Sequence, residues 1–121
     1  MTHFTDRMTD KSVAVATVSA PPGTLRVTCS GPTIEFDTRV AFGKIGVSYR
    51  FDNGEVVPRF FDMLQDGRTL LFTNYLLTMT REISRAKRLR MTVFLPGQSA
   101  IFMDFDLTGA KDAIKALGCR G

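Results

Sequence analysis

The residue types that perform chemistry are few in this chain. His3 is the only histidine among its 121 residues, and it lies near the start, where the backbone has little capacity to hold an imidazole in place. Histidine-based triads need a fixed imidazole, and a zinc site needs three or four closely spaced ligands. The sequence also has no phosphate-binding glycine loop and no nucleophile elbow. We therefore expect no enzyme, no metal site and no cofactor.

Paired carboxylates are the remaining candidates for catalysis. Glu35 and Asp37 alternate along one expected strand, and Asp104 and Asp106 along another. Such pairs can perform acid–base catalysis or hold a hard cation. Basic residues fall opposite them in the expected strand pairing: Arg26, Arg88 and Arg90. We favour charge balance across the sheet over catalysis for these carboxylates.

Two arginines form the candidate binding site that we consider first. Arg50 and Arg59 are expected on neighbouring strands of one hairpin, on the same outer face as Ser48. Two guanidinium groups and a hydroxyl can hold a carboxylate or a phosphate through paired hydrogen bonds. The alternative is that these arginines protect an exposed edge strand from pairing with other chains.

A basic cluster provides a second candidate. It contains Arg81, Arg85, Lys87, Arg88 and Arg90. Nucleic-acid modules combine such clusters with aromatic side chains that stack on bases, and Phe94 and Phe102 are expected on the outer face of the neighbouring hairpin. The formal net charge is only +4, which favours a solvated basic face over a nucleic-acid interface.

The elements that must position these residues are mostly strands. Alternating or β-branched segments predict strands over 12–19, 24–29, 34–40, 45–51, 69–73, 89–95 and 101–107, with a further strand after 55. Apolar residues at helical spacing predict one helix over 75–86, capped by Thr73 or Asn74, and a second that Thr108 caps and Gly118 ends. Residues 1–11 are polar and expected to be loose, so we expect a single β-rich domain over 12–121.

Turn chemistry predicts how three hairpins pair. A four-residue turn after Cys29 would place that residue opposite Ile34. Asn53-Gly54 is typical of a type I′ hairpin, which would place Val47 opposite Phe60. Pro58 marks its strand as an edge or a bulge. Centring the last hairpin on Gly97 aligns the apolar residues of its strands, and also sets Arg90 against Asp104 and Arg88 against Asp106.

These elements predict a mainly β fold. With about eight short strands, one mid-chain helix and one C-terminal helix, the chain is typical of an antiparallel β-sandwich or a partly open barrel. No apolar run approaches the length of a membrane span.

The two cysteines, Cys29 and Cys119, lie at the ends of predicted elements. A disulfide between them is compatible with that placement, and it would persist only in an oxidising compartment. The alternative is a pair of unrelated buried thiols.

Several segments together resemble a known group of proteins. They are 8–10 (MTD), 25–29 (LRVTC), 47–52 (VSYRFD), 86–90 (AKRLR) and 105–110 (FDLTGA), which leads to Leu117 and Cys119. In this order they resemble the type VI secretion-associated, VasI-like small bacterial envelope proteins and their uncharacterised relatives. The resemblance implies a non-enzymatic accessory domain of the periplasm, with a disulfide between Cys29 and Cys119 and with its leader removed or outside this chain. It implies no catalytic residue.

We therefore expect a periplasmic binding domain that contacts a protein or a cell-wall component. The expected contacts are Arg50, Arg59, Arg81 and Arg85. The alternative is a nucleic-acid-binding barrel of a cytosolic or phage protein, which would use Arg81, Arg85, Lys87 and Phe102.

Overall fold

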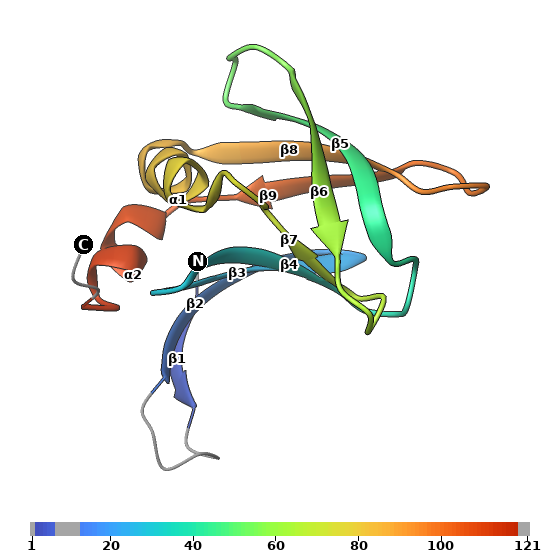
Figure 1. The fold of residues 1–121 in the computed structure, drawn as a ribbon. Helices are drawn as coiled ribbons and strands as arrows, with labels where there is room; N and C mark the ends of the chain where they lie inside the picture. Colours follow the sequence, from blue (N-terminus) through green and yellow to red (C-terminus); the bar gives the residue numbers. More distant parts are fainter. Residues whose placement is uncertain (1, 7–12, 119–121) are drawn as a thin grey trace.

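One antiparallel sheet and two helices make up the computed structural model of this protein, which describes residues 2–6 and 13–118 (Figure 1). The strands are β1 (Thr2–Asp6), β2 (Val13–Ala20), β3 (Gly23–Thr28), β4 (Gly31–Phe36), β5 (Gly43–Phe51), β6 (Val57–Met63), β7 (Thr69–Leu71), β8 (Arg88–Phe94) and β9 (Ile101–Asp106). The helices are α1 (Leu76–Arg85) and α2 (Ala110–Lys115). The strand order is β1-β2-β3-β4-β7-β6-β5-β8-β9.

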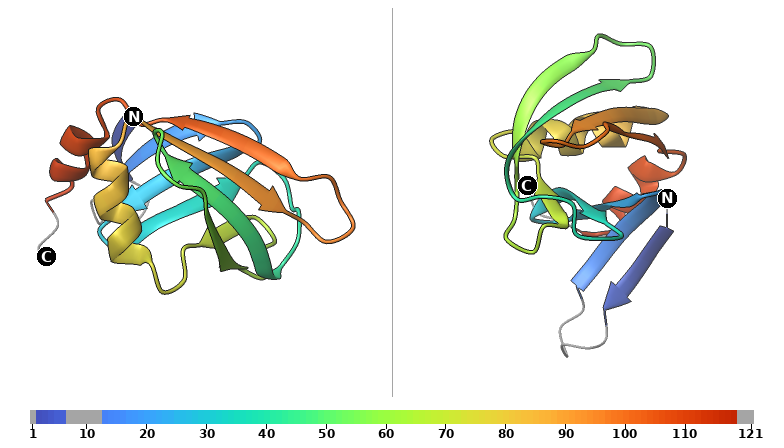
Figure 2. Two further views of the ribbon diagram at one scale, coloured as in Figure 1. Left: turned by 90° about the horizontal axis from the view of Figure 1, so that it is seen from above. Right: turned by 90° about the vertical axis from the view of Figure 1, so that its right-hand side faces the viewer.

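The sheet curls into a nearly closed barrel. Strands β5, β6, β8 and β9 form one wall and β2, β3, β4 and β7 the other, with both helices at one end (Figures 1 and 2). Strand β9 comes close to β2, and Met103 of β9 packs on Gly23, where a Cβ would lie 2.9 Å from its sulfur. The mainly β fold and the partly open barrel are therefore confirmed, with nine strands among residues 2–6 and 13–118 in place of about eight.

The N-terminal residues differ from the expectation. The backbone of β1 pairs with β2, from Thr2 opposite Thr17 to Asp6 opposite Val13, whereas residues 1–11 were expected to be loose. Strand β2 lies beside β3 and near β9. Strand β1 pairs with the part of β2 that projects from the barrel (Figure 1).

The register of the last hairpin is confirmed. Arg88 lies opposite Asp106 and Arg90 opposite Asp104. The β3–β4 hairpin instead has a tight turn at Cys29 and Ser30, so Leu25 lies opposite Ile34. This register differs from the expected one by an even number of residues, so the buried face is unchanged. Cys29, expected opposite Ile34, is instead exposed in the turn.

The register of the β5–β6 hairpin corrects our expectation. Val47 lies opposite Arg59, not opposite Phe60. Positive φ occurs at Asp52 (51°), and the loop runs over 52–56 in place of a two-residue turn at Asn53-Gly54. One residue of shift turns every side chain of β6 to the other face. Phe61 therefore points into the barrel and Phe60 points out.

The edge position of Pro58 is confirmed. Strand β7 pairs only with Asp62 and Met63 of β6, so in the described residues the first half of β6 pairs with β5 alone. Proline lacks the N–H that a second neighbour would require.

Helix α1 covers one end of the barrel (Figures 1 and 2). Met79 and Ile83, one turn apart, are buried, and the helix packs on β4 and α2. The residues before both helices are Tyr75 and Gly109, neither with a side-chain capping bond, so the caps expected at Thr73 or Asn74 and at Thr108 do not form. No helix in the described part of the chain is long and apolar enough to cross a membrane.

Aromatic rings fill the barrel interior. Phe61 packs edge-on against Phe72 with ring centroids 5.0 Å apart, and it stacks on Tyr49 at 6.2 Å. Fully buried Phe36 and Phe105 complete the set of large core rings. This core contains residues from both walls, so the two walls depend on one another for burial.

Two adjacent phenylalanines test the register of β6. Phe61 is fully buried and Phe60 is 69% exposed. We expect Phe61→Ala to lower the free energy of unfolding by about 3–5 kcal/mol through lost burial and a cavity. Phe60→Ala should change it by no more than about 0.5 kcal/mol. Urea denaturation of the two variants measures both values. A larger loss for Phe60→Ala than for Phe61→Ala would contradict the observed register and support the type I′ register instead.

The turn before β7 predicts a loss of stability in acid. The Asp66 carboxylate accepts hydrogen bonds from Thr69 Oγ1 at 2.7 Å and from the backbone N–H groups of Arg68 and Thr69. These bonds, the Thr69 hydroxyl first, hold the pKa of Asp66 below its usual value of 3.8. A lowered folded-state pKa stabilises the protein above the unfolded value, and this contribution is lost as pH falls through the folded value. Denaturation in urea from pH 6 to pH 2 should therefore show a smaller acid loss for Asp66→Asn than for the parent, and equal losses would contradict the assignment.

Candidate binding face

Three rows of outward-facing side chains cross the wall formed by β6, β5, β8 and β9. In order along the strands, the rows are Phe60–Gly46–Phe94, then Pro58–Ser48–Thr92–Phe102, then Arg50–Arg90–Asp104. Successive rows are two residues apart, so all three point to the same side of the sheet. We call this surface the aromatic–arginine face and define it by Phe60, Phe94, Phe102, Arg50, Arg90, Ser48 and Thr92.

Three phenylalanines of this face are open to solvent. Phe60 is 69% exposed, Phe94 53% and Phe102 73%. Phe60 and Phe94 approach Gly46 from either side, since a Cβ there would lie 3.6 Å from Cε1 of Phe60 and 4.0 Å from Cβ of Phe94. Phe102 lies diagonally across β8 and β9 from Phe94, a separation that aromatic side chains can span. The rings therefore lie on one face of the wall, with β5 and its Gly46 between Phe60 and Phe94.

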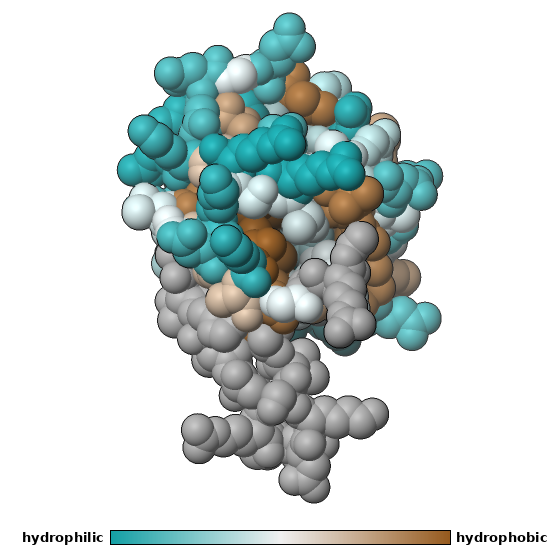
Figure 3. All heavy atoms as spheres, turned by 90° about the vertical axis from the view of Figure 1, so that its left-hand side faces the viewer, coloured by the Kyte–Doolittle hydropathy of each residue, from teal (hydrophilic) through white to brown (hydrophobic). Residues whose placement is uncertain are grey.

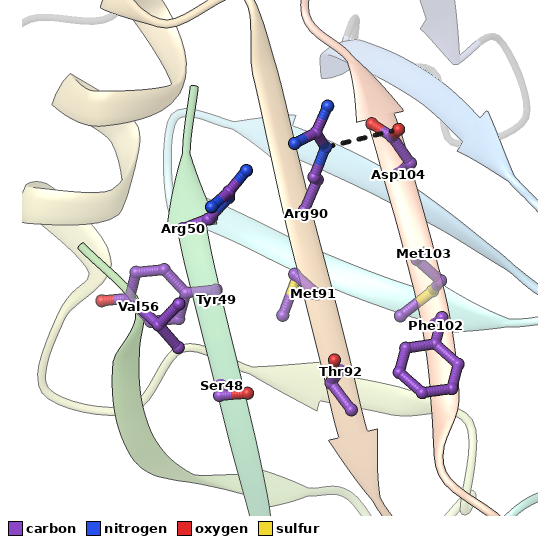
Figure 4. A pocket seen from close by; sticks show the side chains of 10 residues that line it. All are labelled: Ser48, Tyr49, Arg50, Val56, Arg90, Met91, Thr92, Phe102, Met103 and Asp104. Atoms are coloured by element: carbon purple, nitrogen blue, oxygen red, sulfur yellow. Dashed lines mark ion pairs between the residues drawn. The ribbon is translucent and has the colours of Figure 1, made fainter. Parts of the chain in front are cut away.

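A hollow of about 350 Å³ lies on this face, and Phe102 is the one of the three phenylalanines that lines it. The small side chains of Ser48 and Thr92 belong to its lining, together with Val56 from the β5–β6 loop and Phe102 from β9. Arg50 and Arg90 lie side by side at one end of it (Figure 4). The hollow therefore has apolar sides, and at one end two arginines together with the carboxylate of Asp104.

The two arginines at this end directly oppose one another on β5 and β8. Like charges at such positions destabilise a sheet. Arg90 Nε lies 3.7 Å from Oδ2 of Asp104, whose Oδ1 also lies 3.1 Å from Nη1 of Arg88. No carboxylate of the described residues is within ion-pair distance of Arg50. One carboxylate thus serves two arginines and leaves the third without a partner anion.

Arg59 is not part of this face, although the sequence placed it beside Arg50. The shifted register turns it inward, where its Cζ lies 4.6 Å from the ring centroid of Tyr75. Its Nη1 donates to the Pro58 carbonyl at 3.1 Å, and its buried Nε has no hydrogen-bond partner in the described residues. Burial raises the pKa of Tyr49, and the nearby Arg59 cation opposes that rise. Arg59 therefore fastens the β5–β6 hairpin to the residue that precedes α1.

The helix arginines form a separate surface. Arg81 and Arg85 are exposed on α1, and neither lines the hollow that contains Arg50. Figure 3 shows the end of the molecule that carries both helices, where hydrophilic side chains surround a smaller apolar strip. The four arginines predicted to bind a partner therefore fall at three places: the aromatic–arginine face, the space beneath the hairpin, and the helix.

Two of the four paired carboxylates, Glu35 and Asp104, form ion pairs with arginines, as expected. Glu35 bonds Arg26 at 3.0 Å and Arg68 at 3.4 Å, and Asp104 bonds the two arginines of β8. Asp106 accepts hydrogen bonds from the hydroxyl and the backbone N–H of Thr108, which hold its pKa below the usual value. No cluster of three or more potential metal ligands occurs in the part of the chain that the structure describes.

Part of the face was readable in the sequence and part was missed. Alternation along the last hairpin predicted that Phe94 and Phe102 point outward beside Arg90 and Asp104. Phe60 was missed because the type I′ register placed it in the core. The opposition of Arg50 and Arg90 was missed because β5 and β8 are distant in the sequence, and no local signal indicates that they pair.

Cys29 lies in the β3–β4 turn beside the C-terminal segment. Its Sγ is 3.9 Å from the carbonyl oxygen of Leu117, two residues before Cys119. Cys119 lies outside the described residues, so the predicted disulfide stays a prediction.

No family model, no curated protein and no solved structure matches this chain.

Substitution of Arg50 and Arg59 tests their different surroundings. Arg50→Gln should leave the free energy of unfolding within about 0.5 kcal/mol of the parent value, because it removes a surface charge that only repels Arg90. Arg59→Met should lower the free energy by about 1 kcal/mol, because the cation–π contact with Tyr75 is lost. Urea denaturation measures both. An equal loss in the two variants would make Arg50 a structural residue.

Proposed function

We propose that this protein is a non-enzymatic binding domain of the periplasm that holds a protein partner against the aromatic–arginine face. The observation that carries the proposal is the exposure of Phe60, Phe94 and Phe102 on one face of the β6-β5-β8-β9 wall, beside an arginine without a partner anion. Contiguous exposed apolar surface on a folded domain marks an interaction site. Aromatic residues and arginine are the types that contribute most to protein–protein binding energy.

The periplasmic part of the proposal depends on the cysteines. The Sγ atom of Cys29 lies 3.9 Å from the carbonyl oxygen of Leu117, two residues before Cys119 in the sequence, which supports the disulfide. The resemblance to VasI-like envelope proteins supports the same compartment and an accessory role beside a secretion system. A cell-wall component in place of a protein is consistent with the resemblance, but the three phenylalanine rings favour a protein.

A nucleic-acid-binding function is the second candidate. Arginines beside exposed rings on a sheet are also the elements with which single strands are bound, and this observation favours it. The formal net charge of only +4 opposes it, because nucleic-acid-binding domains are typically more strongly basic. We therefore place this candidate second.

Photo-crosslinking in native cells tests the face and separates the two candidates. A benzophenone side chain replaces Phe102 in one variant and Phe42 in a matched control, since Phe42 is 69% exposed but lies outside the face. We expect an adduct from position 102 only, and we expect protease to digest its added mass. Digestion by nuclease would establish the second candidate. Equal crosslinking at both positions, or none at 102, would contradict the proposed face.

The oxidation state of the cysteines tests the compartment. Thiols are alkylated at the moment of lysis, and intact mass is then measured on protein from its native cells. We expect no alkyl group, because both cysteines are oxidised in an envelope compartment. Two alkyl groups would mean reduced thiols and would contradict the periplasmic location.

A further inference from the structure

We propose that the aromatic–arginine face recognises an extended acidic segment of the partner, in which a carboxylate binds Arg50 and a neighbouring apolar side chain enters the hollow over Ser48 and Thr92. This inference rests on the proposed function and adds the chemistry of the partner. The partner is thus defined by a carboxylate side chain and an apolar side chain close together on one strand-like segment.

The charges at the end of the hollow call for an anion. Asp104 pairs with Arg88 and Arg90, and no carboxylate of the described residues is within ion-pair distance of Arg50. Two further carboxylates lie near Arg88 and are already hydrogen-bonded: Asp106 accepts from Thr108, and Asp52 accepts from the backbone N–H groups of Lys87 and Arg88. A carboxylate bound at Arg50 would offset the repulsion between Arg50 and Arg90. The planar guanidinium suits the two oxygens of a carboxylate.

The remaining residues that line the hollow indicate which side chain of the partner lies next to the carboxylate. Val56 and Phe102 supply apolar contact, and both are largely exposed, at 60% and 73%. Ser48 and Thr92 contribute hydroxyls in the neighbouring row and leave room because they are small. An apolar side chain placed there removes water from both hydrocarbon surfaces, which is favourable in proportion to the area buried. A polyanion without apolar groups would contact the arginines but would not bury the apolar side chains that line the hollow.

The spacing of the rows indicates an extended segment. The arginine row and the row of Ser48 and Thr92 are two residues apart along each strand, a separation of about 7 Å. Side chains two residues apart on an extended peptide have the same spacing and point to the same side. A segment with an acidic residue and an apolar residue at positions i and i+2 therefore meets both rows at once.

The test uses two blocked synthetic peptides and the whole chain. One peptide alternates Glu and Leu around a central Phe, and the other has Gln at every Glu. Peptide binding is followed by fluorescence anisotropy, and NMR locates the perturbed backbone amides. We expect the acidic peptide to shift the amides of Ser48, Arg50 and Thr92 and to bind about tenfold or more tightly than the Gln peptide, the loss expected when a hydrogen bond to a charged group is removed. Equal binding of the two peptides, or no binding of either at millimolar concentration, would overturn the inference.

Matched variants decide which arginine carries the binding. Arg50→Gln should weaken binding of the acidic peptide by about tenfold or more, while Arg85→Gln, which removes an exposed charge on α1, should leave binding unchanged. Arg50→Lys keeps the charge but not the planar fork, and should recover part of the loss. A loss with Arg85→Gln alone would move the site to the helix and overturn the inference.

The two proposals fail in different ways. A protein adduct at position 102 that Arg50→Gln leaves unchanged, together with equal binding of the two peptides, would overturn the acidic segment and retain the protein-binding face. Absence of the adduct would overturn the face itself. Binding of an oligothymidylate in preference to the acidic peptide would replace the partner with a nucleic acid.

Discussion

The attachment of Asp52 to the start of β8 is the constraint on which the rest of the structure depends. Its carboxylate accepts the backbone N–H of Lys87 at 3.0 Å and of Arg88 at 2.9 Å, and its own N–H donates to the Arg88 carbonyl. These three bonds hold Asp52 at positive φ, a conformation that aspartate tolerates better than most residues. They fix the end of β5 beside β8, so the chain must use the whole of 52–56 to return as β6.

That longer loop decides which side chains of β6 enter the barrel. Phe61 joins the aromatic core and Arg59 packs beneath the hairpin on Tyr75. Phe60 is left on the outside, next to Phe94 and across from Gly46. One local arrangement of hydrogen bonds thereby builds the core and exposes a ring of the aromatic–arginine face. Sheet registers change in whole residues and each step exchanges the faces of the strand, so no intermediate arrangement is available.

The face combines two features that are unfavourable in an isolated domain. Exposed phenylalanine rings leave apolar surface in water, and opposed arginines repel across the sheet. The ion pairs of Asp104 offset part of the repulsion, but they lie at the surface, where such pairs contribute little. A partner that covers the rings and supplies an anion would remove both penalties, which is the physical basis of the proposed function.

The sequence by itself determined the strand-rich class, the mid-chain helix and the pairing of the last hairpin, because alternation, helical spacing and the turn at Gly97 are local properties of neighbouring residues. In β8 and β9 the apolar alternation and the opposite charges of Arg90 and Asp104 agree, so one register satisfies both. The tertiary structure alone decided the face of Arg59, the exposure of Phe60 and the meeting of Arg50 with Arg90. The physical reason is that all three features depend on contacts between β8 and residues about 35 to 40 positions earlier in the chain. The local turn preference of Asn53-Gly54 is weaker than the three hydrogen bonds of Asp52 together with the buried aromatic core.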